Sequence, residues 1–202
     1  MGAMLPRTTV VFFGDSFVAG IGDPSGLGWT TRLTADRAGE SIDLTAYNLG
    51  IRRNTSSDVR DRWERELSAR ELPGSASRIV LSFGVNDCVA EDGCVRVPAA
   101  TSVRNLESIV CRAGECGLPV MFVGPPPVAD TEINARLEAA DKALLDVARD
   151  AGAAATSVFG DLLRDEIWME EVRAGDGAHP GAEGYRRFAD LVRPTWSRWL
   201  AE

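Results

Sequence analysis

Short apolar runs alternate with longer amphipathic segments along the whole chain, and this alternation constrains the fold most. Five runs that are rich in β-branched or small apolar residues predict buried strands at residues 8–13, 42–48, 78–83, 119–123 and 154–158. Helical periodicity predicts helices at residues 29–38, 55–70, 98–114, 134–151, 161–173 and 182–200. Because strands and helices alternate, we expect a parallel sheet with helices on both faces.

Proline and glycine mark several boundaries of these elements. Pro98 stands at the start of a predicted helix, where its missing N–H costs nothing. Gly74 follows a proline and ends the charged helix at residues 55–70. Pro194 lies inside the last predicted helix and is expected to kink or split it. No repeat or linker interrupts the 202 residues, so we expect a single domain over residues 1–202.

The charge and hydropathy of the chain exclude two classes of partner. The net charge is −8 and the pI about 4.8, which argues against nucleic-acid binding, because phosphate recognition needs a basic face. No apolar run approaches the roughly 18 residues of a membrane-spanning helix. The short apolar run at residues 10–13 lacks the other marks of a secretory signal, so a cytoplasmic location is expected.

The four cysteines do not form a recognisable metal-binding pattern. Their spacings match no zinc motif, and we therefore expect no metal at Cys88, Cys94, Cys111 or Cys116. Reduced structural thiols are the expected state in a cytosolic protein. The spacing leaves open a Cys88–Cys94 bridge that would pin the loop after residue 87, and equally a Cys111–Cys116 bridge.

Polar or glycine-containing segments follow each of the first three predicted strands. Ser16 follows the first strand in a Gly-Asp-Ser segment, Gly50 closes the second, and Asn86 follows the third. Ligands of parallel α/β sheets bind beyond the carboxyl ends of the strands. We therefore expect these three residues to gather at one edge of the sheet.

The only histidine, His179, lies in a Gly/Pro-containing loop just before the last predicted helix. Asp176 precedes it by three residues, a spacing that lets a carboxylate reach the imidazole Nδ1–H in a turn. Such a contact fixes the tautomer and stabilises the imidazolium that forms during turnover. The alternative is that Asp176 only caps the turn or the following helix.

Ser16 can act as a nucleophile only with a base, because a free hydroxyl is weakly nucleophilic. It can equally cap a helix, as serines often do. Acyl transfer also needs hydrogen-bond donors for the developing oxyanion. The Gly50 backbone N–H and the Asn86 side chain can supply them, although either residue can simply serve a turn.

The ordered set of these segments resembles a known family. Gly-Asp-Ser near the N-terminus, a glycine after the second strand, Gly-x-Asn-Asp after the third and Asp-x-x-His-Pro near the C-terminus resemble the SGNH hydrolases, also called GDSL esterases and lipases. The four invariant positions of that family are matched by Ser16, Gly50, Asn86 and His179, and its catalytic aspartate is matched by Asp176.

This resemblance covers nearly the whole chain, with Phe17 where the name-giving motif has leucine. It implies a flavodoxin-like three-layer α/β/α sandwich with about five parallel strands in the order 2-1-3-4-5, and neither a metal nor a cofactor. It also implies a serine esterase that works through an acyl-enzyme, with Ser16, His179 and Asp176 as a triad. The backbone N–H of Ser16, with Gly50 and Asn86, would bind the oxyanion.

The substrate expected from this resemblance is a small-molecule acyl ester. Deacetylation of a sugar and thioester hydrolysis are the alternatives within the family, and a decayed, non-catalytic binding module is the alternative outside it. Carbohydrate chemistry would favour an aromatic platform, for which Trp29 and Trp168 are candidates, although a buried tryptophan more often belongs to the core. The loops at residues 85–98 and 125–129 are expected to shape the pocket.

Overall fold

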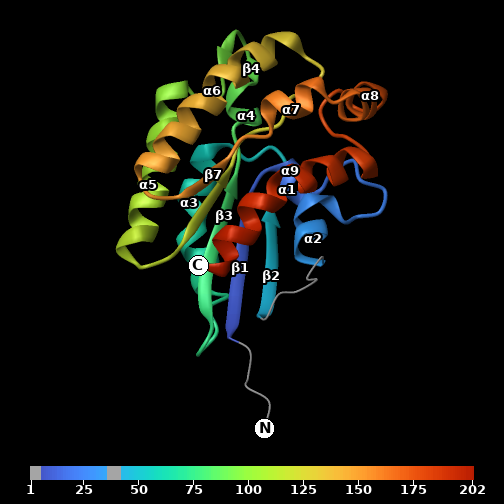
Figure 1. Ribbon diagram of the computed structural model, residues 1–202. Helices are drawn as coiled ribbons and strands as arrows, with labels where there is room; N and C mark the ends of the chain where they lie inside the picture. Colours follow the sequence, from blue (N-terminus) through green and yellow to red (C-terminus); the bar gives the residue numbers. More distant parts are fainter. Residues whose placement is uncertain (1–5, 36–41) are drawn as a thin grey trace.

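The computed structural model describes residues 6–35 and 42–202. Within these residues, five strands form one sheet: β1 (Arg7–Gly14), β2 (Asp43–Gly50), β3 (Ala76–Ser82), β6 (Val120–Val123) and β7 (Ala154–Thr156). Their spatial order is β2-β1-β3-β6-β7, and every neighbouring pair is parallel (Figure 1). This arrangement confirms the predicted order 2-1-3-4-5, with β6 and β7 as the fourth and fifth strands.

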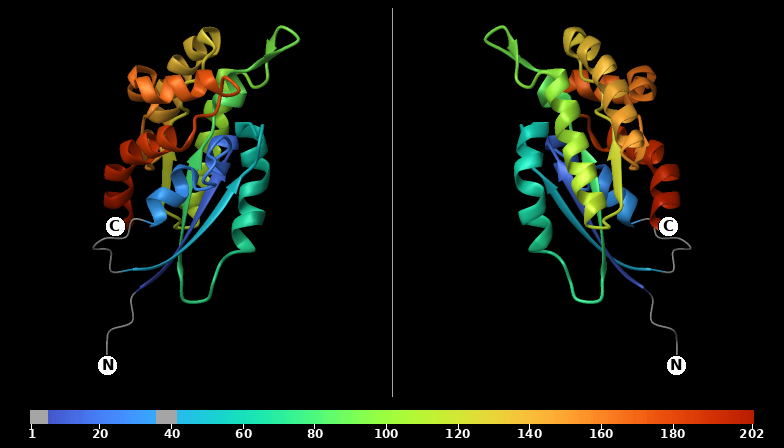
Figure 2. Two further views of the ribbon diagram at one scale, coloured as in Figure 1. Left: turned by 90° about the vertical axis from the view of Figure 1, so that its right-hand side faces the viewer. Right: turned by 90° about the vertical axis from the view of Figure 1, so that its left-hand side faces the viewer.

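Helices cover both faces of the sheet, as Figure 2 shows in two opposite views. One face carries α2 (Gly28–Ala35) and α9 (Ala182–Ala201), and the other carries α3 (Ser56–Ser68), α5 (Ala99–Glu115) and α6 (Thr131–Asp150). No helix in the described part of the chain combines the length and the apolar character needed to cross a membrane.

The core lies in two layers because neighbouring side chains of a strand point to opposite faces. On β1, Val10 and Phe12 belong to the layer beneath α2 and α9, whereas Val11 and Phe13 belong to the layer beneath α3 and α5. Strands that are buried on both faces therefore read as continuous apolar runs, which is why the sequence revealed them.

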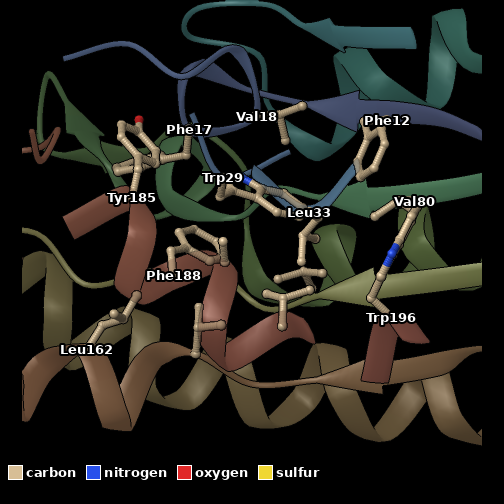
Figure 3. Packing of buried hydrophobic residues seen from close by; sticks show 14 of the residues in the cluster. Phe12, Phe17, Val18, Trp29, Leu33, Val80, Leu162, Tyr185, Phe188 and Trp196 are labelled. Carbon is tan, nitrogen blue, oxygen red and sulfur yellow. The ribbon is translucent and has the colours of Figure 1, made fainter. Parts of the chain in front are cut away.

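Aromatic rings fill the layer beneath α2 and α9 (Figure 3). Phe12 stacks on Trp196 at 5.6 Å between centroids, and Trp29 stacks on Phe188 at 4.9 Å. Trp29 and Trp168 are both fully buried here. The expectation that either offers a sugar-binding platform is therefore wrong, because both indoles are core residues.

One predicted helix differs from the structure and another is only partly described. The structure describes α2 as far as Ala35, and the predicted helical residues 36–38 lie outside the described residues. The single helix predicted at residues 161–173 is wrong, because two helices occupy this region, α7 (Phe159–Arg164) and α8 (Glu166–Ala174). The break falls at Asp165, whose carboxylate accepts a hydrogen bond from the Trp168 backbone N–H at 2.9 Å and caps α8.

Pro194 does not split the last helix, since α9 runs without interruption from Ala182 to Ala201. A proline inside a helix removes one backbone hydrogen bond and strains the turn before it. Val192, Trp196 and Trp199 are buried around it. The packing of this apolar face holds the helix together through the proline, as tertiary contacts do for most helices in proteins.

Four elements near the edge of the sheet were not predicted: α1 (Ser16–Ala19), α4 (Val85–Cys88), and the antiparallel pair β4 (Ala90–Glu91) and β5 (Cys94–Val95). Each is too short to show a periodicity in the sequence. All four cysteines, which lie in the described part of the chain, are free, and Cys88 is the buried one. Neither disulfide that the spacing left open is formed.

Candidate active site

The ends of three strands lie level at one edge of the sheet. Gly14, at the end of β1, is the register partner of Gly50 on β2 and of Ser82 on β3. Ser16 follows Gly14 at the start of α1, and Asn86 follows Ser82 within α4. The loops after the strands therefore converge as the pattern predicted.

Ser16, His179 and Asp176 form a continuous hydrogen-bonded chain. Ser16 Oγ lies 2.8 Å from His179 Nε2, although 163 residues separate them in sequence. His179 Nδ1 lies 2.7 Å from Asp176 Oδ2. Both imidazole nitrogens are thus engaged, which selects the tautomer with its proton on Nδ1 and leaves Nε2 free to accept the serine proton.

Backbone hydrogen bonds hold the Asp176 carboxylate in place. Its Oδ1 atom accepts from the backbone N–H groups of Ala178 at 3.0 Å and His179 at 2.9 Å. Partial burial acts to raise the pKa of Asp176, but the hydrogen bonds from His179 and Ala178 outweigh it and lower the pKa to about 2. Asp176 is therefore a carboxylate at any ordinary pH, oriented toward the imidazole.

Two positions near His179 favour glycine, Gly22 because of close packing and Gly177 because of its left-handed backbone. A Cβ on Gly22 would lie 2.8 Å from His179 Cβ and 2.6 Å from the Pro180 carbonyl oxygen, and Gly22 has a φ of +92°. Gly177 has a φ of +82°, and its carbonyl accepts from the Ala129 N–H at 2.8 Å. Nothing in the local sequence pattern singles out Gly22, because its role depends on a contact across the fold.

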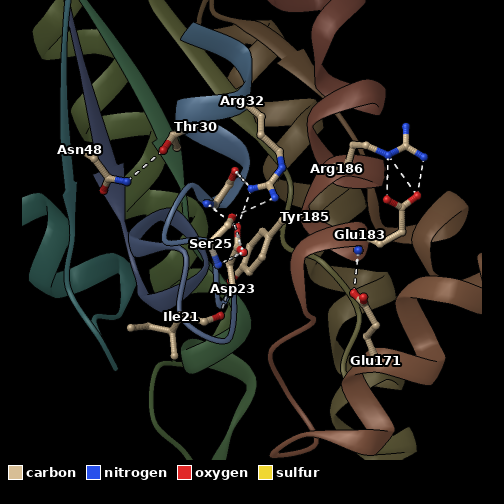
Figure 4. Close-up of polar contacts among 12 residues, drawn as sticks. Ile21, Asp23, Ser25, Thr30, Arg32, Asn48, Glu171, Glu183, Tyr185 and Arg186 are labelled. Carbon is tan, nitrogen blue, oxygen red and sulfur yellow. Dashed lines mark hydrogen bonds and ion pairs between the residues drawn. The ribbon is translucent and has the colours of Figure 1, made fainter. Parts of the chain in front are cut away.

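Figure 4 shows how the loop that carries Gly22 is anchored. Asp23 accepts hydrogen bonds from the backbone N–H of Gly28 and from Arg32, which closes the loop after α1. The buried Tyr185 of α9 donates its hydroxyl to the Ile21 carbonyl at 2.7 Å. These contacts connect the loop behind Ser16 to the helix behind His179.

Close packing and hydrogen bonds, which the sequence motif did not reveal, hold the segment that carries Ser16. A Cβ on Gly14 would meet the Ser82 carbonyl oxygen at 2.0 Å, so only glycine fits there. Asp15 is 2 % exposed, and its carboxyl group accepts from the Phe17 N–H at 2.9 Å and from Asn86 Nδ2 at 3.3 Å. Asp15 thereby caps α1 and also reaches the predicted oxyanion donor.

The pKa of Asp15 moves in the direction opposite to that of Asp176. Burial raises the pKa of Asp15 to about 7, against the hydrogen bond from Phe17, and the nearby Asp87 carboxylate adds to the rise. The carboxyl group beside Ser16 thus changes charge near neutral pH, while the one beside His179 remains ionised.

Two of the predicted oxyanion donors, the Gly50 N–H and the Asn86 amide, already hydrogen bond to acceptors within the protein. The Gly50 N–H donates to Asn48 Oδ1 at 3.0 Å, and the Asn86 amide donates to Asp15 and to the Asn54 carbonyl at 3.1 Å. A Cβ on Gly50 would lie 2.2 Å from the Ala19 nitrogen, so this position requires glycine. Both donors lie against the Ser16 segment, but each must exchange a hydrogen bond before it serves an oxyanion.

Asp87, the neighbour of Asn86, fixes α4 to two other helices. Its carboxylate accepts from the Ser56 N–H at 2.8 Å and from the Ser102 hydroxyl at 2.6 Å, which joins α4 to α3 and α5. Burial raises the pKa of Asp87. In the part of the chain that the structure describes, no group of three or more histidine, cysteine or acidic residues is arranged to hold a metal ion.

A pocket of about 330 Å³ opens over Ser16 and His179. One wall is aliphatic and is formed by Val85, Val89, Val128, Ala129 and Ile133. Both loops that were expected to shape the pocket contribute to this wall. The site therefore joins a polar reacting centre to an apolar surface that suits the alkyl part of a small substrate.

Comparisons with known proteins identify the family and the fold. Residues 12–187 match the GDSL-like Lipase/Acylhydrolase family. No curated protein sequence is significantly similar to the chain.

Solved structures share the fold at low sequence identity. A lipase/acylhydrolase from Enterococcus faecalis superimposes with a TM-score of 0.74 at 22% identity, covering 93% of this chain and 94% of that one. An acetylxylan esterase from Geobacillus stearothermophilus gives 0.75 at 17% identity, covering 97% and 98%. An alpha/beta hydrolase from the metagenome of Lake Arreo, Spain, gives 0.76 at 19% identity, with the same coverages.

Proposed function

This chain belongs to the GDSL-like lipase/acylhydrolase family, and from that premise we propose that it cleaves acyl esters through a covalent intermediate on Ser16. Family membership makes the protein a hydrolase of carboxylic esters. The observation that carries the proposal is the hydrogen-bonded chain from Ser16 Oγ through His179 to Asp176.

In the first step, Ser16 Oγ attacks the ester carbonyl carbon while His179 Nε2 takes the hydroxyl proton. The contact of 2.8 Å between Oγ and Nε2 supports this transfer, because a general base must be within hydrogen-bond reach. The ionised Asp176 stabilises the imidazolium that results.

The tetrahedral intermediate places negative charge on the former carbonyl oxygen. The backbone N–H of Ser16, the Gly50 N–H and the Asn86 amide are the proposed donors. Asn86 lines the same pocket as Ser16, and its contact with Asp15 is long at 3.3 Å, which makes it the bond most readily exchanged.

His179 then returns the proton to the leaving alcohol, and the ester C–O bond breaks to leave an acyl group on Ser16. A water molecule next attacks this acyl carbonyl and gives its proton to His179 Nε2. Collapse of the second intermediate releases the acid and restores the Ser16 hydroxyl.

Small acyl esters are the substrates that this pocket suits best. Its aliphatic wall accepts an alkyl group, and it offers no cluster of cationic side chains for a charged one. Deacetylation of a sugar is the second candidate, because an acetylxylan esterase is among the similar folds. Trp29 and Trp168 are fully buried, so neither offers an aromatic platform for a sugar.

A panel of p-nitrophenyl esters, thioesters and acetylated sugars tests the proposal. We expect Ser16→Ala to lower ester turnover on the order of 10⁴-fold, since triad members act as a unit. Ser68→Ala, at an exposed serine of α3, is the matched control and is expected to retain activity. Turnover that survives Ser16→Ala would contradict the proposal, and absence of any turnover in the unaltered protein would favour a decayed binding module.

A further inference from the structure

A second hollow of about 230 Å³ lies next to the active-site pocket and has no part in the steps above. Its walls are mostly aliphatic and include Val95, Val97, Ala139 and Ala140. The two oxygen-bearing side chains in its lining, Asp87 and Ser102, hydrogen bond to each other at 2.6 Å. They are therefore satisfied without a ligand, and the hollow suits an apolar group.

The second hollow continues the line of the first. On the segment after β3, Val89 lines the active-site pocket and its neighbour Cys88 lines the second hollow. On α6, Ile133 lines the first and Arg136 the second. Residues three apart share one face of a helix, so the two hollows lie end to end along the same face of α6.

Arg136 lines the second hollow, three residues along α6 from Ile133, which lines the first. Its Nε atom donates to the Cys88 carbonyl at 2.8 Å and so bridges α6 to the end of α4. An alkyl chain that leaves the active-site pocket meets this polar bridge before it reaches the aliphatic walls beyond. Passing it would require the guanidinium group to give up its hydrogen bond, which is unfavourable next to an apolar chain.

We propose that the second hollow is a subsite for the distal part of an alkyl acyl chain, and that Arg136 separates it from the active-site pocket and so restricts the enzyme to short acyl esters. This inference rests on the proposed function, because it assigns the acyl group to the aliphatic wall beside Ser16. The continuity of the hollow with that wall and its aliphatic lining argue for an alkyl chain as the occupant.

The test compares kcat/KM for p-nitrophenyl acetate, butyrate and octanoate in the whole protein and in Arg136→Ala. Burial of each added methylene strengthens binding about fourfold, so opening the subsite is expected to raise the octanoate-to-acetate ratio about tenfold or more. Arg149→Ala is the matched control, because Arg149 lies exposed on the same helix and does not line either hollow. Its ratio is expected to stay unchanged.

A filling variant distinguishes this subsite from a general loosening of the pocket. Ala139 lines the second hollow from an exposed position of α6. Adding Ala139→Leu to Arg136→Ala is expected to return the octanoate-to-acetate ratio to that of the unaltered protein. Arg136→Met, which keeps most of the stem but not the charge, carries the same expectation if Arg136→Ala does not fold.

The outcomes separate the two proposals. An active Arg136→Ala enzyme with the original chain-length profile would overturn the subsite and leave the proposed function standing. A gain on octanoate that Ala139→Leu does not reverse would also overturn the subsite. Ester turnover that does not depend on Ser16 would overturn the proposed function, and the subsite with it.

Discussion

Two aspartates lie in the candidate site, one beside Ser16 and one beside His179, and their environments shift their pKa values in opposite directions. Asp15 precedes Ser16, is 2 % exposed, and has a pKa that burial raises to about 7. Asp176 precedes His179, its side chain is 48% exposed, and hydrogen bonds lower its pKa to about 2 despite partial burial. Identical side chains thus carry different charges near neutral pH.

This difference matters for the proposed mechanism. In that mechanism the Asp176 carboxylate has to stay charged to stabilise an imidazolium on His179, and solvent together with N–H donors keeps it charged. A charged carboxylate beside Ser16 would lie close to the developing oxyanion and oppose it. Burial favours the neutral form there, and the Asp15 carboxyl group instead holds Phe17 and Asn86 in position.

Among changes to the two aspartates and the side chains they contact, Asp176→Asn is expected to have the largest effect on turnover. The amide keeps the shape of the side chain but removes the charge, and it can present an N–H to His179 Nδ1, which favours the wrong tautomer. We expect kcat to fall on the order of 10³–10⁴-fold in a p-nitrophenyl ester assay. A fall of less than tenfold would show that Asp176 only caps the turn before α9.

Asn86→Ala is expected to have the next largest effect. It tests the part of the site that contains Asp15, to which Asn86 donates a hydrogen bond. Removal of one oxyanion donor typically costs about 10²–10³-fold in kcat, with little change in KM. Steady-state kinetics on one short-chain ester measure both constants. A change confined to KM would show that the Asn86 amide serves the ground state rather than the transition state.

The pH dependence of stability provides a test that does not involve turnover. The raised pKa of Asp15, compared with an ordinary value of 3.8, stabilises the fold fully below about pH 4, and this contribution is lost as the pH rises through about 7. Asp15→Asn removes this titration, so stability is expected to fall less steeply between these limits. The difference should amount to a few kcal/mol, since one pKa unit corresponds to about 1.4 kcal/mol.

Asp176→Asn is expected to act at the other end of the pH range. A lowered pKa stabilises the fold above about pH 4 and loses that contribution as the pH falls through about 2. Because Asp176 is half-exposed, we expect less than about 1 kcal/mol. Urea unfolding across this range measures both variants, with Asp61→Asn on the surface as the control. Equal slopes for Asp15→Asn and the unaltered protein would contradict the assignment.

Arg52→Ala should have the smallest effect. The Arg52 guanidinium lies 3.7 Å from Asp176 Oδ2, but its side chain is 60% exposed. Ion pairs of this kind contribute little in water and are screened by salt. We expect kcat/KM to change by less than about fivefold, and less still at high ionic strength. A loss of a hundredfold would show that Arg52 touches the substrate.

The five strands could be located in the sequence because buried parallel strands appear as continuous apolar runs. Their order came from the family resemblance, as did the roles expected of Ser16, Gly50 and Asn86. Their positions after the first three strands predicted only that they would gather at one edge of the sheet. His179 and Asp176 could be paired because the contact between them is local, three residues apart in one turn.

Features that depend on tertiary contacts could not be read in this way. The break at Asp165 and the continuity of α9 through Pro194 depend on capping and packing rather than on periodicity. The burial of Trp29 and the opposite environments of Asp15 and Asp176 likewise arise only when distant segments meet. The identity of a residue can be read from the sequence, but its exposure to solvent depends on the fold.

Covalent labelling can identify Ser16 as the nucleophile without a choice of substrate. A fluorophosphonate reacts with a serine that a neighbouring base activates, and peptide mass spectrometry locates the adduct. We expect one adduct, on Ser16. It should be absent from Ser16→Ala and retained in Ser68→Ala. An adduct on another residue, or undiminished labelling of Ser16→Ala, would contradict this assignment.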